Sequence, residues 1–360
     1  MGMKDSSYMQ IAHYTIDRQL GSGAQGDVFL AHNQEGQAVA LKVLKAELSS
    51  DKEIAGRFQR ESQVAMSIRH PHVVAAVDAG VNDKGQPWLA YQYITGGDLE
   101  QLIAQQKRIP PLQALTLMRG IIAGLGALDA AGLIHRDIKP ANILLHEDGR
   151  AMITDHGLAR STNDARTQYT MTGMIIGSPA YMAPEQIEGA DNLDIRADLY
   201  GAGIMWYELL TGNVPYTADT VIALLHQHLD APLPTAQHII AEVPTIDPRQ
   251  ISLLCSLLAK KPSQRPARPQ VVLDQLDKLL KQGADPAADA YPKTIDAAPA
   301  DAYPQTIDAA SAMPFPMTID ENTPSPTPST INPPFRQPLI MVLRHFRRPW
   351  ITMVSPSPQP

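Results

Sequence analysis

The sequence lacks three features that would point to common protein classes. It has one cysteine, Cys255, so it cannot build an internal disulfide framework, which predicts a reducing, cytoplasmic location. Lys and Arg are not in excess over Asp and Glu: the counts are 25 against 30 in residues 1–283 and 5 against 7 in residues 284–360, which disfavours a nucleic-acid binder. No apolar stretch approaches the roughly 18 uninterrupted residues of a membrane-spanning helix, so no span is expected.

Glycine is also absent from the last 77 residues, where proline is abundant. All 23 glycines lie at or before Gly283, whereas 16 of the 31 prolines lie beyond it. Proline-rich chain with little apolar content cannot bury a core. The split therefore predicts a folded body followed by a disordered, proline-rich tail.

Within the body, the pattern of apolar residues changes near residue 95. Short alternating runs separated by turn residues predict strands at 14–20, 27–33, 37–44, 73–79 and 88–94, with a helix at 51–68 among them. Helical spacing then predominates, at 99–106, 112–131, 197–210, 220–228, 249–259 and 270–281. The body is thus predicted to be α+β, with a small β-rich lobe joined to a larger helical lobe.

A glycine-rich segment, Gly21-Ser22-Gly23-Ala-Gln-Gly26, follows the first predicted strand. Alone, this spacing fits a dinucleotide fingerprint, a simple turn or a phosphate-covering hairpin. A dinucleotide site needs a helix after the glycines, but a strand-like run follows here, which favours the hairpin. Lys42, flanked by apolar residues in a later strand, is either a surface lysine or a cation that meets an anion between the lobes.

A second motif is far more specific: His135-Arg-Asp137-Ile-Lys139-Pro-Ala-Asn142. Phosphoryl transfer needs a carboxylate to accept a hydroxyl proton, metal ligands, and cations against developing charge, and this short string holds all three. Further on, Asp155-His156-Gly157 places a carboxylate just after a predicted strand, where it could hold Mg²⁺.

These motifs, in this order and spacing, resemble those of eukaryotic-like (Hanks-type) bacterial serine/threonine protein kinases. The resemblance implies a bilobal protein-kinase fold over residues 14–282, with lobes at 14–95 and 96–282, an N-terminal extension at 1–13 and the tail at 283–360. It implies transfer of the ATP γ-phosphoryl group to protein Ser or Thr, with Mg²⁺ or Mn²⁺. In the family's order, Asp137 and Lys139 would be catalytic, and Asn142 and Asp155 would bind metal.

The resemblance also assigns the residues of an ATP site. The glycines would cover the phosphates, Lys42 would contact them, and Glu61 would pair with Lys42, with Glu53 as the competing partner. Tyr91 would be the gatekeeper residue, at the back of the adenine pocket. The remaining ATP-binding residues implied are Gly21, Ser22, Gly23, Gly26, Val28, Ala40, Gln92, Tyr93, Ile94 and Leu144.

Outside that site, the resemblance gives structural roles to Glu185, which would pair with Arg265, and to Asp198, which would tie the catalytic loop to a central helix. Thr170 and Thr172 lie where related kinases autophosphorylate, and Arg136 could pair with a phosphothreonine there; the alternative is that threonine is simply common in such a loop. His156 departs from the family's phenylalanine. We expect activity to survive this change, with an altered pH dependence if the imidazole is protonated.

The tail contains a repeat with a period of 12 residues. Asp289-Ala-Tyr-Pro-Lys-Thr-Ile-Asp296 recurs at 301–308 and, in degenerate form, at 314–320, which places Thr294, Thr306 and Thr318 in one Thr-Ile-Asp context. Twelve residues with so few large apolar side chains cannot bury a face, so a solenoid is excluded. The threonines are either phosphate-bearing docking peptides, read for example by a forkhead-associated (FHA) domain, or the product of a duplication without a partner.

Two functions of different classes follow from these residues. One is an active kinase that acts on protein substrates, with self-association for autophosphorylation; the other is a pseudokinase scaffold that holds partners through the fold and the tail. A pseudokinase typically lacks one of the positions held here by Lys42, Asp137, Asn142 and Asp155, so the sequence favours the enzyme. Transfer to a small molecule is disfavoured because the substrate-loop sequence Ala183-Pro-Glu185 is present.

Overall fold

The computed structural model describes residues 10–23, 25–155, 178–190 and 192–283. The chain divides into two units, Met1–Asp308 and Ala309–Pro360, and the described residues all lie in the first. The expected N-terminal extension is only partly described, and the expected tail lies outside these residues apart from Gly283. The domain boundaries therefore stay predictions.

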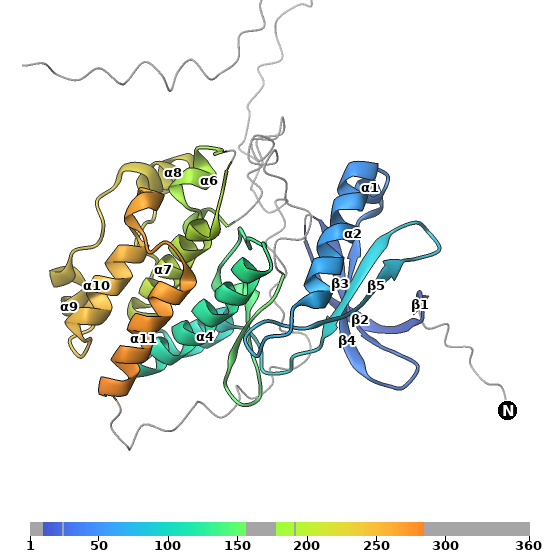
Figure 1. Cartoon of the computed structure of the whole chain (residues 1–360), viewed down its shortest axis with the longest axis horizontal. Coiled ribbons are helices and arrows are strands. Elements are labelled where there is room, and N and C mark those ends of the chain that lie inside the picture. Colours follow the sequence, from blue (N-terminus) through green and yellow to red (C-terminus); the bar gives the residue numbers. More distant parts are fainter. Residues whose placement is uncertain (1–9, 24, 156–177, 191, 284–360) are drawn as a thin grey trace, which may run out of the picture. The chain divides into compact units, whose positions relative to one another are not determined.

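The first lobe is built on a six-stranded antiparallel sheet with the order β1-β2-β3-β4-β6-β5 (Figure 1). The alternating apolar pattern places one face of each central strand in the core; Val39, Leu41 and Val43, for example, are buried. The strands are β1 (Gln10–Ile11), β2 (Tyr14–Ser22), β3 (Gly26–His32), β4 (Ala38–Leu44), β5 (Ala76–Val81) and β6 (Pro87–Gln92).

Helix α2 (Lys52–Ser67) packs on this sheet, after the single turn α1 (Ala46–Ser49). The carboxylate of Asp51 caps its N-terminus by accepting from the amides of Glu53 and Ile54. Phe58 and Ala65 are buried from its inner face in the same cluster as Leu89 and Tyr91, on β6. This packing sets the position of Glu61, one turn beyond Phe58.

The second lobe is helical, and two helices contribute the largest share of its core. Half of the residues of α4 (Pro111–Ala130) and most of those of α7 (Ile195–Thr211) are buried. The other helices are α3 (Leu99–Gln106), α6 (Pro184–Ile187), α8 (Val221–Asp230), α9 (Ala236–Glu242), α10 (Pro248–Leu257) and α11 (Pro269–Gly283), with single 3-10 turns η1 (Pro140–Asn142), η2 (Pro179–Tyr181) and η3 (Pro262–Gln264) and a hairpin of β7 (Ile143–Leu145) and β8 (Ala151–Ile153) (Figure 1).

Among the helices in the described part of the chain, only α4 is long and apolar enough to span a membrane. Some 56% of that stretch is buried, and the helix packs against α7, α11 and β8, as the core helix of a globular domain does. At Gly124 a side chain would meet the carbonyl oxygen of His72 at 2.6 Å, so glycine permits the close approach of this helix to the segment between α2 and β5 of the first lobe.

The α+β, two-lobed fold expected from the sequence is confirmed. The predicted helices agree with α2, α3, α4, α7, α8, α10 and α11 to within about three residues at each end. Helix α9 was not expected. It has seven residues between Pro234 and Pro244, and only Ile239 of them is buried, so it carries almost no helical periodicity.

Candidate active site

The glycine-rich segment forms the expected hairpin between β2 and β3. Gly21 pairs with Val28 and Ser22 with Asp27, and the amide of Gly23 donates to the carbonyl of Gly26 at 2.9 Å. A Cβ at Gly26 would lie 2.4 Å from the carbonyl oxygen of Val43, so glycine is required for the turn to pack on β4. A hairpin with glycine at positions 21, 23 and 26 lets the backbone approach phosphates closely.

Lys42 lies on β4 directly opposite Val28 of the hairpin. Its ammonium donates to Asp155 Oδ1 at 2.6 Å, with 12% of the lysine side chain and 38% of the aspartate side chain exposed. This contact joins the first lobe to the segment after β8, 113 residues later in the chain. The structure thus brings together two of the four residues that the sequence singled out for catalysis.

Glu61 and Asp155 lie close to the buried hydroxyl of Tyr91. Burial raises the pKa of Tyr91 above its usual range, and the charges of Asp155 and Glu61 raise it further. Glu53, the competing partner for Lys42, is 77% exposed at its side chain and pairs with Arg57 one turn away at 2.8 Å. A bond between Lys42 and Glu61 stays a prediction, while Glu53 lies on the solvent side of α2.

The expected adenine-binding residues lie around one apolar cluster. Ala40 and Leu144 are partly buried against it, and Tyr91 and Ile94 belong to its buried members. Gln92 ends β6, and its amide donates to the carbonyl of Ala75 at 2.9 Å. Tyr93 follows and is partly exposed.

The catalytic-loop residues meet around the carboxylate of Asp137. Asn142 Nδ2 donates to the Asp137 carbonyl at 2.8 Å and lies 3.3 Å from Oδ2, and Lys139 Nζ is also 3.3 Å from Oδ2. Turn η1 closes this loop, because the amide of Asn142 donates to the carbonyl of Lys139 at 3.0 Å. Within six residues, a carboxylate, an amide and a cation therefore converge.

Asn142 and Asp155 provide oxygen ligands of the kind that Mg²⁺ prefers. Both bonds from Asn142 to Asp137 use its amide nitrogen, so the side-chain oxygen is the atom that can coordinate a cation. The amide of Thr154 donates to the carbonyl of Asn142 at 3.0 Å, which sets Asp155 beside it. The residues present therefore fit a divalent cation.

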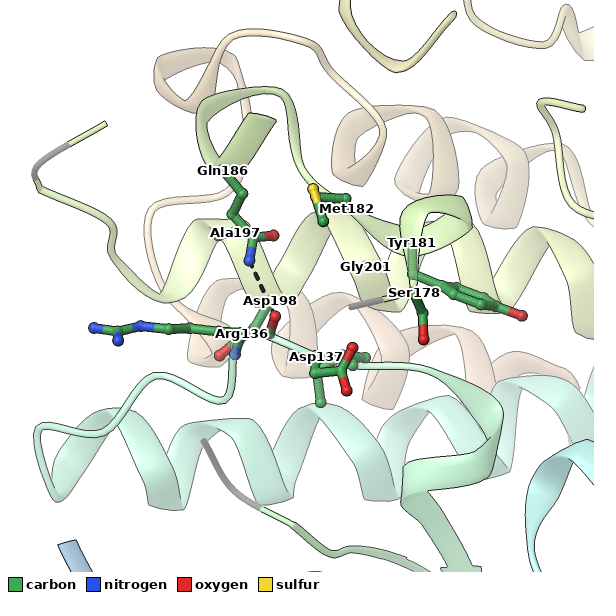
Figure 2. Close-up of a pocket in the computed structure, with 10 residues that line it drawn as sticks. Arg136, Asp137, Ser178, Tyr181, Met182, Gln186, Ala197, Asp198 and Gly201 are labelled. Atoms are coloured by element: carbon green, nitrogen blue, oxygen red, sulfur yellow. Dashed lines mark hydrogen bonds between the residues drawn. The ribbon is translucent and has the colours of Figure 1, made fainter. Parts of the chain in front are cut away.

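A small pocket opens beside Asp137 (Figure 2). Ser178, which precedes the turn η2, and Tyr181, its last residue, lie on one side of the pocket, and Asp137 lies on another. Ser178 Oγ accepts a hydrogen bond from Lys139 Nζ at 2.9 Å, and the Tyr181 hydroxyl donates to Glu208 Oε2 at 2.6 Å. The other lining residues are Arg136, Ile138, Met182, Gln186, Ala197, Asp198 and Gly201.

Asp198 of α7 holds the backbone of the catalytic loop through its carboxylate. Its two carboxylate oxygens accept from the amides of His135 and Arg136, each at 2.7 Å. Burial raises the pKa of Asp198 to about 7, although these two bonds act in the opposite direction. Arg136 has a φ of +66°, so the two bonds also hold a backbone conformation that side-chain-bearing residues rarely adopt.

Glu185 and Arg265 form a buried, two-bond ion pair at 2.6 and 2.8 Å. The guanidinium also donates to the carbonyls of Ala259, Arg196 and Lys260, which accounts for all five of its N–H groups. The pair ties α6, just after the substrate-side turn, to the loop before α11. It supports the site without reaching the reacting atoms.

Several expected residues lie outside the described part of the chain: His156, the activation-segment threonines Thr170 and Thr172, and the tail threonines Thr294, Thr306 and Thr318. The structure in turn shows residues that sequence reasoning missed. Ser178 could have been suspected from its place in the Gly177-Ser-Pro-Ala string, whereas nothing in the local sequence marks Gln186, whose side chain donates to the Arg136 carbonyl at 3.0 Å.

Comparisons with known proteins agree with this geometry. The protein kinase domain family matches residues 14–276. The serine/threonine-protein kinase PknL of Mycobacterium bovis is 35% identical over 255 residues, which cover 71% of this chain and 62% of PknL. A probable serine/threonine-protein kinase of Streptomyces coelicolor is 35% identical over 256 residues, covering 70% of this chain and 37% of that protein. The chain thus spans less than two thirds of these relatives.

Among solved structures, the crystal structure of the Mycobacterium tuberculosis PknI kinase domain is similar with a TM-score of 0.58 and 30% identity, covering 77% of this chain and 99% of that domain. The family match, the identity to bacterial serine/threonine kinases and the fold all coincide with the residues that form the site. The chain belongs to the protein kinase domain family.

Proposed function

We propose that the chain is an ATP-dependent serine/threonine protein kinase. The observation that carries the proposal is the meeting of the catalytic set, defined as Lys42, Asp137, Asn142 and Asp155, from three separate segments. Lys42 bonds Asp155 at 2.6 Å, and Asn142 lies 3.3 Å from the Asp137 carboxylate. A scaffold without catalysis would have no need of this arrangement.

In the proposed reaction, the hydroxyl oxygen of a protein Ser or Thr attacks the γ-phosphorus of ATP. The bond from that phosphorus to the oxygen bridging it to ADP breaks, ADP leaves with the electron pair, and the hydroxyl proton passes to the Asp137 carboxylate. Lys139 lies beside Asp137 and Ser178, where its positive charge would stabilise the negative charge of the transferred phosphoryl group. Asn142 and Asp155 would hold Mg²⁺, which supplies further positive charge to the phosphates.

The direct test is transfer of label from γ-labelled ATP with Mg²⁺ to casein, followed by phosphoamino-acid analysis. We expect label in phosphoserine and phosphothreonine, its loss with EDTA, and its loss in Asp155→Asn. A matched control is Asp277→Asn, which breaks a partly exposed pair with Arg119 remote from the site. Absence of label with the wild-type protein, or label only in phosphotyrosine, would contradict the proposal.

We also propose that one copy of the chain phosphorylates the activation segment of another, at Thr170 and Thr172, through transient self-association. Both threonines lie outside the described residues. The support comes from Arg136, a cation next to Asp137 in the pocket lining, which suits pairing with a phosphothreonine. If wild-type protein failed to label an Asp137→Asn copy at these positions, the proposal would be wrong.

For the tail, we propose phosphorylation at Thr294, Thr306 and Thr318 and reading by an FHA-domain partner. The same Thr-Ile-Asp tripeptide occurs twice in the folded body, at residues 15–17 in β2 and 245–247 before α10. There the isoleucines are buried, with 8% and 6% exposed, so an enzyme cannot read the tripeptide as a free peptide.

Mass-spectrometric mapping after incubation with ATP and Mg²⁺ tests the tail proposal. Phosphate is expected on the three tail threonines, with Thr15 and Thr245 as unmodified internal controls and Asp137→Asn as the inactive control. Triple Thr→Ala substitution in the tail should abolish binding of an FHA-domain protein. Equal modification of Thr245, or unchanged binding after the triple substitution, would remove the proposed selectivity.

A further inference from the structure

Gln186 lies in the short helix α6, after the turn η2, and has no role in the mechanism above. Its side chain reaches the catalytic loop, where Nε2 donates to the carbonyl of Arg136 at 3.0 Å (Figure 2). The two residues are 50 positions apart in the sequence. Because Arg136 immediately precedes Asp137, this side chain contacts the peptide group that leads into the proposed general base.

The side-chain amide of Gln186 is oriented by its two partners. The backbone amide of Ala183 donates to Gln186 Oε1 at 3.0 Å, and the Gln186 backbone amide donates back to the Ala183 carbonyl at 2.9 Å. A backbone N–H can only donate and a carbonyl can only accept, so the oxygen must face Ala183 and the nitrogen must face Arg136. The preceding residue, Glu185, is anchored by its buried pair with Arg265. The side chain therefore extends from a firmly held base.

The peptide group between Arg136 and Asp137 is held at both of its polar ends. Its N–H, the amide of Asp137, donates to His135 Nδ1 at 3.3 Å. His135 Nε2 lies 2.7 Å from the carbonyl of Thr154, which can only accept, so the ring hydrogen is on Nε2 and Nδ1 is the acceptor. Its C=O, the carbonyl of Arg136, accepts from Gln186. Two side chains from different segments thus set the orientation of this one peptide group.

The backbone of Arg136 needs such support because its φ of +66° is one that residues with a side chain rarely adopt. Asp198 accepts from the amides of His135 and Arg136, so it fixes the two peptide groups before this residue. Neither bond restrains the next peptide group, between Arg136 and Asp137. Rotation of that group would turn the Asp137 carboxylate, and the Gln186 amide is placed to resist it.

We propose that Gln186 is a positioning residue for Asp137: its side-chain amide holds the Arg136–Asp137 peptide group in the orientation that directs the Asp137 carboxylate toward the acceptor hydroxyl. The inference rests on the proposed kinase function. Among the described residues, the side-chain bonds of Gln186 go to Ala183 and Arg136, neither of which belongs to the expected ATP site. Loss of the bond to Arg136 should therefore lower kcat and leave the KM for ATP unchanged.

Two variants that each keep one of the two side-chain bonds provide the test. Gln186→Glu keeps an acceptor for the Ala183 amide but sets an oxygen against the Arg136 carbonyl, whereas Gln186→Lys keeps a donor for that carbonyl and loses the acceptor. With casein as acceptor, we expect kcat to fall about tenfold in the Glu variant and at most about threefold in the Lys variant. The matched control is Gln275→Glu: this exposed glutamine of α11 donates to the Val271 carbonyl at 3.5 Å, and its variant should behave as wild type.

The proposal is overturned if the Lys variant has a kcat no higher than that of the Glu variant, which would mean that the amide only caps α6, or if the KM for ATP rises as kcat falls. Wild-type protein that transfers no phosphate at all would instead refute the proposed function. Should neither variant fold, a crystal structure of the wild-type protein decides: Gln186 Nε2 within hydrogen-bond distance of the Arg136 carbonyl is expected, and a separation beyond about 3.5 Å would overturn the proposal.

Discussion

The residues of the catalytic set and the residues that support them, Glu185, Asp198 and Arg265, differ in how far their side chains are exposed. Lys42, Asp137 and Asp155 keep 12%, 16% and 38% of their side chains exposed, whereas Asn142 is buried with 8% exposed. Arg265 is fully buried at its side chain, and Asp198 is 2% exposed, with both its oxygens bonded to backbone amides. The two carboxylates of the catalytic set therefore remain accessible to substrate, whereas the Asp198 carboxylate and the Arg265 guanidinium do not.

This difference separates two kinds of mutational effect. A change in the catalytic set should remove an interaction with substrate and leave the fold intact. A change in Glu185 or Arg265 leaves a buried charge without its partner, and a change in Asp198 leaves two backbone amides without their acceptor. We therefore expect activity and stability to be lost independently in the two regions.

The largest effect on stability is expected from Arg265→Ala. It leaves the buried Glu185 carboxylate without its cation and three carbonyls without their donor, so the free energy of unfolding should fall by about 3–5 kcal/mol. Chemical denaturation measures the loss. Arg249→Ala, which removes an exposed arginine paired with Asp247, serves as the control and should have little effect. Similar losses in both variants would remove the distinction between buried and exposed pairs.

Next in size is the pH dependence conferred by His228, which is buried on helix α8. Its folded-state pKa of about 4 lies below the ordinary value of 6.5, so the unfolded chain binds more protons in this window. The stability contributed by the neutral ring is present above about pH 6.5 and lost as the pH falls through 4, by about 3 kcal/mol in total. His228→Gln should flatten this part of the difference curve between pH 6.5 and 4. A curve parallel to the wild type would show that the ring is not kept neutral by burial.

A smaller effect distinguishes the two glutamates of α2. Glu61→Gln should lower phosphoryl transfer about tenfold, because it removes a negative charge from the group around Lys42, Asp155 and Tyr91. Glu53→Gln breaks only the exposed pair with Arg57 and should change transfer little and stability by about 0.3–0.5 kcal/mol. Equal transfer rates in the two variants would contradict the assignment of Glu61 to the site.

The resemblance assigned both the catalytic set and its supports Glu185, Asp198 and Arg265, but it did not point to every residue that the structure places beside them. The string from His135 to Asn142 identified the loop because phosphoryl transfer restricts which residue types can stand there. His228, Gln186 and Ser178 escaped notice because their importance comes from contacts between segments that lie far apart in the chain. For the two glutamates of α2, the resemblance favoured Glu61 over Glu53, and the structure adds that Glu53 is exposed and paired with Arg57 while Glu61 lies near Tyr91.

The most direct test of the account is Asp137→Asn, with three quantities measured on one preparation: phosphoryl transfer to casein, ATP affinity and the melting temperature. Removal of the general base should lower transfer by about 10²–10⁴-fold. The ATP affinity and melting temperature should remain near wild-type values, because Asp137 belongs to the partly exposed catalytic set. Undiminished transfer, or a loss of transfer that accompanies unfolding, would contradict the separation of chemistry from support on which the account rests.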